Sequence, residues 1–353
     1  MMKNPTYLFA AAEKEDFRKY LEEKSAAHCS IFIVLDENTE KYCKKKLLED
    51  FPVLDNARQI MVKSGEKNKN FESCNKIWLK LITYHADRCS LLVNLGGGVI
   101  TDLGGFAASS YKRGISFCNV PTTLLGMIDA SIGGKTGLDY NGLKNIIGSF
   151  SFAEKTYIDP EFLRTLPERH IRSGCAELLK IALISDKRLW QDLKLRDIRD
   201  IIDRTDLIQE AVKLKDKIVQ DDPLEKNVRK KLSFGHTIGH AVESSSLMND
   251  KKPLLHGEAV AIGMVCEAWL SKKKKLLSGA ELDEVIYKIF RLTLTRKFKA
   301  DATGIMEFIR NDKKNSGQKI NFTLLSSIGE AKTDNFIDEK LIADSLVFYN
   351  NLL

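Results

Sequence analysis

The first half of the sequence alternates between short apolar stretches and longer stretches in which apolar residues recur at helical spacing. Residues 30–35, 90–95 and 117–120 are mainly apolar, and each runs into a polar or glycine-rich turn. Residues 70–84 lie between the first two and have apolar residues three and four positions apart. Because buried strands separated by helices are typical of a parallel sheet covered on both faces, we predict a Rossmann-like α/β domain over residues 1–165.

The second half has a different texture, which predicts a second domain. From about Pro167 onward, three-to-four-residue periodicity dominates and glycine becomes sparse. A chain of 353 residues is long enough for two domains of ordinary size. We therefore expect a mainly α-helical domain over residues 166–353, with the boundary between Asp159 and Arg169.

A glycine-rich segment, Gly96 to Gly105, follows the second predicted strand and opens a predicted helix. Glycine permits close backbone approach, and the N–H groups that open a helix can bind phosphate oxygens. The usual dinucleotide fingerprint G-x-G-x-x-G would need glycine at position 101, where the sequence has Thr101. Taken alone, this turn is as often structural as functional.

Other polar loops follow the predicted strands of the first half. Asp36, residues 64–69 and residues 121–123 each come directly after an apolar stretch. In an open α/β sheet such loops meet at one edge, so a diphosphate-bearing cofactor is expected there. For Asp36 by itself, an ordinary loop position is an equally good interpretation.

Three of the six histidines fall between positions 236 and 256. His236 and His240 are four residues apart, hence on one face of a helix, and His256 begins another helical stretch. Upstream, Glu177 and Lys180 lie three apart in an otherwise apolar helix, where an unpartnered charge would be costly. Two imidazoles and one carboxylate would form a three-ligand zinc site with an open position. The alternative is one histidine near a helix end and one in the core.

The basic residues favour a small anionic ligand. Lys135 follows two glycines, and Lys144 and Asn145 lie in a second short segment bounded by glycine, which suits phosphate binding. The glycine spacing before Lys135 does not complete a Walker A motif, so an ATPase is not favoured. The net charge of +7 is modest and no basic tail concentrates it, which argues against a nucleic-acid partner.

Cysteine usage and hydropathy indicate a cytoplasmic protein. The seven cysteines are odd in number and include no C-x-x-C pair, which favours a reducing compartment over a disulfide framework. The first residues lack the apolar stretch of a signal peptide, and no apolar run is long enough for a membrane span.

Seven blocks in sequence order resemble the 3-dehydroquinate synthase family, within the sugar-phosphate cyclases. They are GGGVITD, YKRGISF, VPTTLLGMIDASIGGKTG, KNIIGSF, GCAELLK, LSFGHTIGHAVE and LLHGEAVAIGM. The resemblance extends from about residue 30 to residue 320. It implies conversion of 3-deoxy-D-arabino-heptulosonate 7-phosphate to 3-dehydroquinate and phosphate in aromatic amino acid biosynthesis. The implied steps are transient oxidation by NAD, β-elimination of phosphate, re-reduction and intramolecular aldol closure.

The resemblance also implies residue roles. Zinc, or cobalt, would be bound by Glu177, His236 and His256. The implied acid/base residues are His240 and Glu225, with Lys180, Asp129 and Lys135 as further catalytic candidates. Substrate would be bound by Arg113, Asn145, Lys215, Arg229 and Lys313, with Lys314 as the alternative to Lys313. Arg113 would reach the site of a neighbouring subunit, since the family is commonly dimeric. NAD would lie against Asp36, Ser64, Glu66, Lys69, Gly97, Gly98, Val99, Ile100, Thr101, Asp102, Thr122, Thr123, Lys135, Lys144, Phe162, Leu163, Arg164 and Thr165.

The sequence departs from the family pattern at a few positions. Ser233 stands where asparagine is usual, and Thr101 and Leu143 each replace a glycine. Cys175 replaces a common leucine. Ser233 is the departure nearest the expected anion site, where a shorter hydroxyl replaces the usual amide.

Three other functions are consistent with parts of this pattern. A cyclase of the 2-deoxy-scyllo-inosose synthase kind would use glucose 6-phosphate and would not need Lys215 and Arg229 for a carboxylate. A polyol dehydrogenase of the glycerol dehydrogenase kind would release NADH in stoichiometric amounts. A non-catalytic binding protein would have lost a metal ligand or a lysine, and the sequence retains them.

Overall fold

The computed structural model describes residues 5–141, 143–194, 196–294, 297–310 and 319–353. The chain divides into two compact units, Met1–Leu166 and Pro167–Leu353, and each is described by itself. Lys313 and Lys314 lie outside the described residues. None of the described helices is long and apolar enough to cross a membrane.

The first unit is built on a six-stranded, fully parallel sheet with the order β1-β8-β5-β4-β2-β3. Its strands are β1 (Tyr7–Phe9), β2 (Ile31–Asp36), β3 (Arg58–Val62), β4 (Leu91–Gly96), β5 (Ser116–Pro121) and β8 (Lys155–Ile158). The helices between them are α1 (Ala10–Ala26), α2 (Glu37–Tyr42), α3 (Lys44–Asp50), α4 (Phe71–Thr83) and α5 (Gly98–Ser110). The parallel α/β architecture predicted for this half is confirmed.

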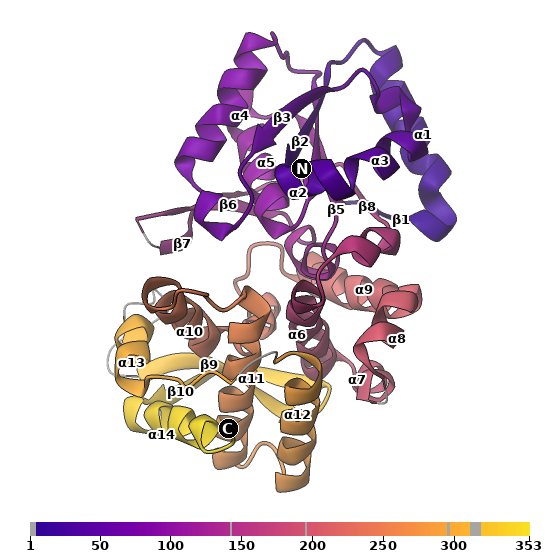
Figure 1. Ribbon diagram of the computed structural model, residues 1–353. Helices are drawn as coiled ribbons and strands as arrows, with labels where there is room; N and C mark the ends of the chain where they lie inside the picture. Colours follow the sequence, from indigo (N-terminus) through magenta and orange to yellow (C-terminus); the bar gives the residue numbers. More distant parts are fainter. Residues whose placement is uncertain (1–4, 142, 195, 295–296, 311–318) are drawn as a thin grey trace. The chain divides into compact units, whose positions relative to one another are not determined.

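Helices cover both faces of this sheet (Figure 1). Residues such as Val34 and Leu92 point to one face, where they pack against α4 and α5. On the other face, Phe17 from α1 stacks on Tyr157 of β8 at a centroid distance of 4.9 Å. Burial on both faces explains why the central strands read as continuous apolar runs instead of alternating ones.

Short elements between the main helices and strands carry several polar candidates of the first unit. They are η1 (Pro52–Leu54), η2 (Glu66–Asn68), η3 (Tyr111–Arg113), η4 (Gly126–Ala130), η5 (Pro160–Thr165) and an antiparallel hairpin of β6 (Lys135–Tyr140) and β7 (Leu143–Phe150). The hairpin was not predicted. It places Lys135 at the start of β6, and Lys144 and Asn145 within β7.

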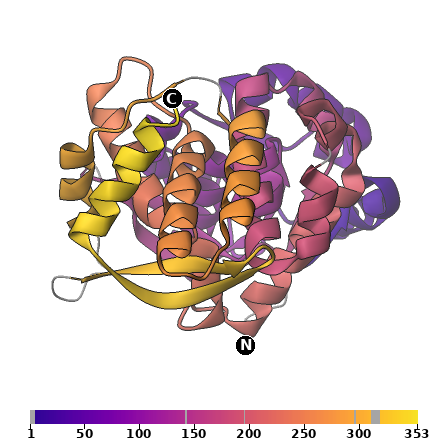
Figure 2. The ribbon, with the colours of Figure 1, turned by 90° about the horizontal axis from the view of Figure 1, so that it is seen from below.

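The second unit is mainly helical, as predicted. Its helices are α6 (Glu168–Ser185), α7 (Lys187–Lys194), α8 (Ile198–Asp203), α9 (Thr205–Asp221), η6 (Val228–Ser233), α10 (His236–Asn249), α11 (His256–Lys273), α12 (Gly279–Leu292), α13 (Ala302–Arg310) and α14 (Glu339–Asn350). Fourteen residues of α11 are buried, which identifies it as the central helix. An antiparallel hairpin of β9 (Lys319–Ser327) and β10 (Glu330–Asp338) lies beside the helices (Figure 2).

Candidate functional site

The carboxylate of Glu177 lies on α6 with no exposed surface. The ammonium group of Lys180, one turn later on the same helix, forms an ion pair with it. Neither carboxylate oxygen accepts a hydrogen bond of good geometry within the described part of the chain. Burying a carboxylate costs free energy unless its oxygens have hydrogen-bond or cation partners. A cation in addition to Lys180 would therefore stabilise the ionised Glu177 side chain.

Imidazoles from two other helices face this carboxylate. The Nε2 atoms of His236, on α10, and His256, on α11, are each 3.6 Å from Oε1 of Glu177. Two ligands about 2.1 Å from a tetrahedral zinc ion lie roughly 3.4 Å apart, so this spacing suits a shared ion. The three sequence-predicted ligands therefore come together at one place in the second unit.

The other ring nitrogens of these imidazoles are held by groups that fix the ring orientation. Nδ1 of His256 is 3.0 Å from Oε2 of Glu243, and Nδ1 of His236 is 3.1 Å from the carbonyl oxygen of Phe234. Metal-binding histidines usually donate this second N–H to a carboxylate or carbonyl, which directs Nε2 to the metal. Glu243 was not identified from the sequence, although it lies seven residues after His236 on the same helical face.

The pKa shifts of His256 and Glu177 also favour a cation at this cluster. Burial opposes the charged imidazolium, but the carboxylates of Glu243 and Glu177 outweigh it and raise the pKa of His256 to about 10. Burial likewise opposes the charged form of Glu177, yet Lys180 and His256 lower the pKa of this carboxyl well below its usual range. The carboxylates of Glu177 and Glu243 thus stabilise positive charge near the Nε2 atoms.

His240 lies close enough to belong to the same cluster. Ring nitrogens of His236, His240 and His256 all lie within 4.8 Å of one another. A set of three imidazoles is therefore a geometric alternative to the set with Glu177. We favour Glu177 because its buried oxygens otherwise lack hydrogen bonds within the described residues, and its Oε1 faces two Nε2 atoms at 3.6 Å.

Close backbone packing brings these helices together. A Cβ atom at Gly257 would lie 1.9 Å from the carbonyl oxygen of Ser173 in α6, and one at Gly263 would lie 2.0 Å from that of Gly235. No larger residue fits at either position without moving a backbone. The glycines next to and beyond His256 therefore let α11 contact both α6 and the start of α10.

The basic candidates of the second unit are buried beside an ordered loop. Lys215 on α9 and Arg229 on η6 are only 5% and 2% exposed. The carboxylate of Asp222 accepts hydrogen bonds from the backbone N–H groups of Lys226 at 2.9 Å, Asn227 at 2.6 Å and Arg229 at 3.1 Å. Asp222 thus shapes the segment that carries Glu225 and Arg229, a role that the sequence did not reveal.

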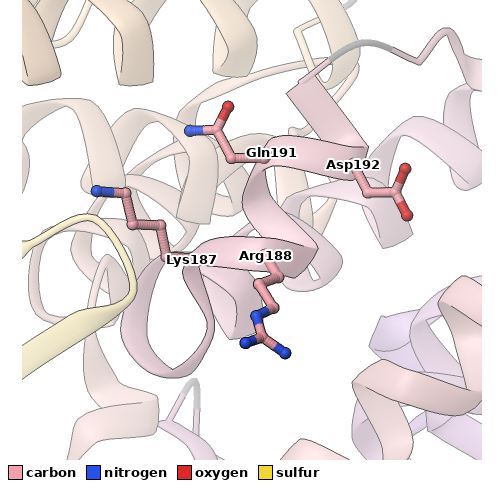
Figure 3. Close-up of a pocket in the computed structure, with 4 residues that line it drawn as sticks. All are labelled: Lys187, Arg188, Gln191 and Asp192. Carbon is pink, nitrogen blue, oxygen red and sulfur yellow. The ribbon is translucent and has the colours of Figure 1, made fainter.

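Two hollows were found in the second unit. One of about 280 Å³ includes Glu225, Ser233 and Thr237 in its lining, so two residues named from the sequence border the same cavity. The other lies on α7 and is lined by Lys187, Arg188, Gln191 and Asp192, whose side chains spread in different directions (Figure 3). Because these charges do not converge, the α7 hollow has no features of a binding site.

In the first unit, the glycine-rich turn joins β4 to α5. Gly97 is the N-cap of α5, and no side chain caps this helix end. A Cβ atom at Gly97 would lie 2.9 Å from Cγ2 of Thr123, so the turn packs tightly against the loop after β5. A helix start without a capping side chain offers its N–H groups to an anion. The side chains of Ile100 and Thr101 are buried, and Thr101 bonds back to the turn through its hydroxyl.

A buried ion pair lies beside this turn. Lys69, 4% exposed, pairs with Asp102 of α5, and its Nζ donates a hydrogen bond to Oδ1 of Asn145 at 2.5 Å. Burial opposes the charged ammonium, but the carboxylates of Asp102 and Glu66 outweigh it and raise the pKa of Lys69. Lys144 forms a further ion pair with Glu66 at 2.8 Å. Four residues named for NAD and one named for substrate therefore form a single polar network.

The remaining candidates of the first unit have varied surroundings. Oδ1 of Asp36 caps α2 by accepting from the N–H groups of Asn38 at 3.0 Å and Thr39 at 2.8 Å. The hydroxyl of Ser64 bonds to Glu37. Phe162 and Leu163 are core residues, and Arg164 pairs with Glu161. Thr122 is buried after β5, Asp129 lies in η4, and Arg113 is exposed in η3 with a φ of 66°.

Solved structures with this architecture define a class. A 2-epi-5-epi-valiolone synthase from Streptomyces hygroscopicus subsp. jinggangensis 5008, with NAD+ and Zn2+ bound, is similar with a TM-score of 0.84 and 26% identity, covering 100% of this chain and 98% of that one. A 2-deoxy-scyllo-inosose synthase complexed with carbaglucose-6-phosphate, NAD+ and Co2+ has a TM-score of 0.83 and 22% identity, covering 96% and 95%. A probable glycerol dehydrogenase from Sinorhizobium meliloti 1021 has a TM-score of 0.63 and 13% identity, covering 100% and 98%. The chain has the fold of the sugar-phosphate cyclases.

Sequence comparison narrows this class to one family. Residues 59–173 match the 3-dehydroquinate synthase N-terminal domain, and residues 174–315 match its C-terminal domain. A 3-dehydroquinate synthase of Parabacteroides distasonis is 42% identical over 340 residues, covering 95% of each chain. One of Campylobacter concisus is 40% identical over 288 residues, covering 81% of this chain and 82% of that one. The chain belongs to the 3-dehydroquinate synthase family, which confirms the resemblance seen in the sequence.

Proposed function

We propose that this protein converts 3-deoxy-D-arabino-heptulosonate 7-phosphate to 3-dehydroquinate and phosphate, with NAD and a divalent metal ion, Zn2+ or Co2+, as cofactors. The family assignment and relatives that carry this name support the reaction. The observation that carries the proposal in this chain is the buried Glu177 carboxylate, which lacks good hydrogen bonds and faces two Nε2 atoms at 3.6 Å.

In this proposal the two units have different tasks. Residues 1–165 bind NAD through the turn before α5 and the Lys69–Asp102 network, and residues 166–353 bind the metal ion and the substrate. When bound, the metal supplies Lewis acidity to substrate hydroxyl groups. The turn before α5 and the Lys69–Asp102 network would hold NAD, which would supply reversible hydride transfer without net consumption of the cofactor.

The chain's own residues orient the anionic substrate and move protons. Lys215 and Arg229, buried near the Asp222 loop, bind its negatively charged ends, and Lys180 beside Glu177 adds a donor. His240, with its ring 5.0 Å from that of His236, is within reach of groups bound at the cluster and serves with Glu225 as proton acceptor and donor. The family resemblance names Asp129, Lys135 and Asn145, which lie in the first unit, as further candidates for substrate contact.

Homodimer formation is part of the proposal. The edge of β7 is unpaired within the described residues, and the hairpin exposes Tyr140, Leu143 and Phe150 by 51%, 54% and 40%. An open edge with exposed apolar side chains favours pairing with a second copy. Arg113, exposed in η3, would then contribute to the partner's site. The free cysteines support a cytoplasmic location.

One assay separates this reaction from its rivals. Purified protein is incubated with NAD, zinc and the heptulosonate phosphate, and phosphate, 3-dehydroquinate and NADH are followed together. We expect equal amounts of phosphate and 3-dehydroquinate with no net NADH. Turnover of glucose 6-phosphate instead would support the 2-deoxy-scyllo-inosose synthase alternative. NADH equal to the product formed from a polyol would support a glycerol dehydrogenase.

A further inference from the structure

Glu267 is a fully buried carboxylate on α11 for which the proposed reaction provides no role. Its Oε2 accepts a hydrogen bond from the backbone N–H of Gly235 at 2.5 Å, and its Oε1 accepts one from the N–H of Ile238 at 3.2 Å. Both N–H groups belong to the start of α10. The first N–H groups of a helix lack partners within it, so a carboxylate there satisfies them and also faces the positive end of the helix dipole.

The start of α10 depends on this side chain because it has no cap of its own. Gly235 is the N-cap residue, has a φ of +79° and has no side chain to accept a hydrogen bond. The space around it is closed, since a Cβ atom at Gly235 would lie 2.4 Å from Cγ of Met264. Glu267 lies one helical turn after Gly263, where α10 and α11 touch, and from there it reaches the first N–H groups of α10, which have no partner within the helix.

These two hydrogen bonds enclose the metal-binding end of α10. Gly235 directly precedes His236, and Ile238 lies two residues after it. We infer that Glu267 is a positioning residue for the metal centre: it fixes the first turn of α10 and thereby the direction in which His236 presents Nε2 to Glu177. The inference rests on the proposed metal function of this cluster and adds a residue that contacts neither metal nor substrate.

A second capping carboxylate in the same unit provides a matched control. Oδ1 of Asp338 accepts a hydrogen bond from the N–H of Leu341 at 2.9 Å and caps α14. This helix carries no candidate site residue. Loss of either cap should destabilise the protein, but only loss of the Glu267 cap should change metal binding.

The test compares Glu267→Gln and Glu267→Ala with Asp338→Asn and the unmodified protein. Zinc affinity is measured by competition with a chromophoric chelator, the Co2+ absorption spectrum reports the ligand arrangement, and circular dichroism reports folding. The Gln variant keeps the shape but offers one acceptor and one NH2 donor to two N–H groups. We expect it to weaken zinc binding about 10- to 100-fold and to alter the Co2+ spectrum, while Asp338→Asn stays within about twofold of the unmodified protein.

Folded Glu267→Gln with zinc affinity within about twofold of the unmodified protein and an unchanged Co2+ spectrum would overturn the inference, because Glu267 would then be a purely structural cap. Should Glu267→Ala fail to fold, the Gln variant alone decides. These readouts do not require turnover. If the unmodified protein binds zinc but makes no 3-dehydroquinate, the proposed reaction fails, and zinc affinity still decides the role of Glu267.

Discussion

Each unit contains a buried lysine–carboxylate pair next to its candidate site, and the two pairs differ in how completely they are satisfied. In the first unit, Lys69 pairs with Asp102 and also donates to Asn145, so the ammonium lies within a network of side chains. In the second, Lys180 pairs with Glu177, but both carboxylate oxygens lack good hydrogen bonds and two imidazoles face one of them. The first arrangement holds loops in place, whereas the second leaves capacity for a metal ion.

The largest expected effect comes from Glu177→Gln. An amide removes the negative charge that a divalent ion requires, so we expect zinc content to fall from about one per chain to nearly none, and activity to fall about 10,000-fold. Zinc analysis after gel filtration and the phosphate assay check this. Glu168→Gln, an exposed position on the same helix, serves as the control. Full zinc retention in Glu177→Gln would show that Glu177 is not a metal ligand, and the Lys180–Glu177 pair would then not differ from the Lys69–Asp102 pair in metal binding.

Breaking the pair in the first unit should reduce stability. Lys69→Met leaves the carboxylate of Asp102 without its charge partner, and we expect the free energy of unfolding to fall by about 3–5 kcal/mol. Adding Asp102→Asn removes the unpaired buried charge and should restore most of the lost free energy of unfolding. Urea denaturation of the two variants measures this. If Lys69→Met alone is as stable as the unmodified protein, the ion pair does not stabilise the loops of the first unit.

A smaller effect is expected at His240, and it decides between the two ligand sets. If His240 transfers protons and does not bind metal, His240→Asn should lower kcat about 100-fold and keep its zinc. Loss of zinc together with activity would instead favour the set of three imidazoles. His85→Asn is a suitable control because His85 is exposed, lies in the other unit and has a positive φ of 55° that asparagine tolerates.

The smallest expected effect is at the glycine-rich turn. In Gly97→Ala, the added methyl group meets Thr123 at 2.9 Å and narrows the approach to the start of α5. We expect NAD to bind about tenfold more weakly, a cost of about 1.4 kcal/mol, measured by calorimetry. Gly279→Ala provides the control, since its nearest neighbour would be the end of Lys272 at 3.7 Å. Equal NAD affinity in both variants would argue against a nucleotide at this turn.

The fold class could be predicted because local sequence pattern decided it. The central strands β2, β4 and β5 are buried on both faces, so they appear as apolar runs, and α4 has clear helical spacing. The two hairpins were missed. No residue of β7 is buried, and β10 is largely polar, so neither has the pattern of a buried strand. The position of β8 between β1 and β5 depends on contacts between distant residues, which no local pattern encodes.

The candidate site could likewise be predicted where local spacing decides, but not where contacts between distant residues decide. Spacing within a helix placed His236 beside His240 and Glu177 beside Lys180. The cost of an unpartnered buried charge suggested that Glu177 joins two imidazoles, and the particular ligand set was implied by the family resemblance. Glu243, Asp222 and Glu267 support the site through backbone groups or a ring nitrogen. Their partners lie on other elements or in loops, so sequence spacing alone does not single out these carboxylates.

The central claim is that Glu177, His236 and His256 share one metal ion. X-ray absorption at the zinc edge counts the imidazole ligands directly, and it can be measured on the unmodified protein and on His240→Asn. We predict two imidazoles and oxygen ligands in both samples. Three imidazoles in the unmodified protein, falling to two in His240→Asn, would contradict the assignment of Glu177 as the third ligand.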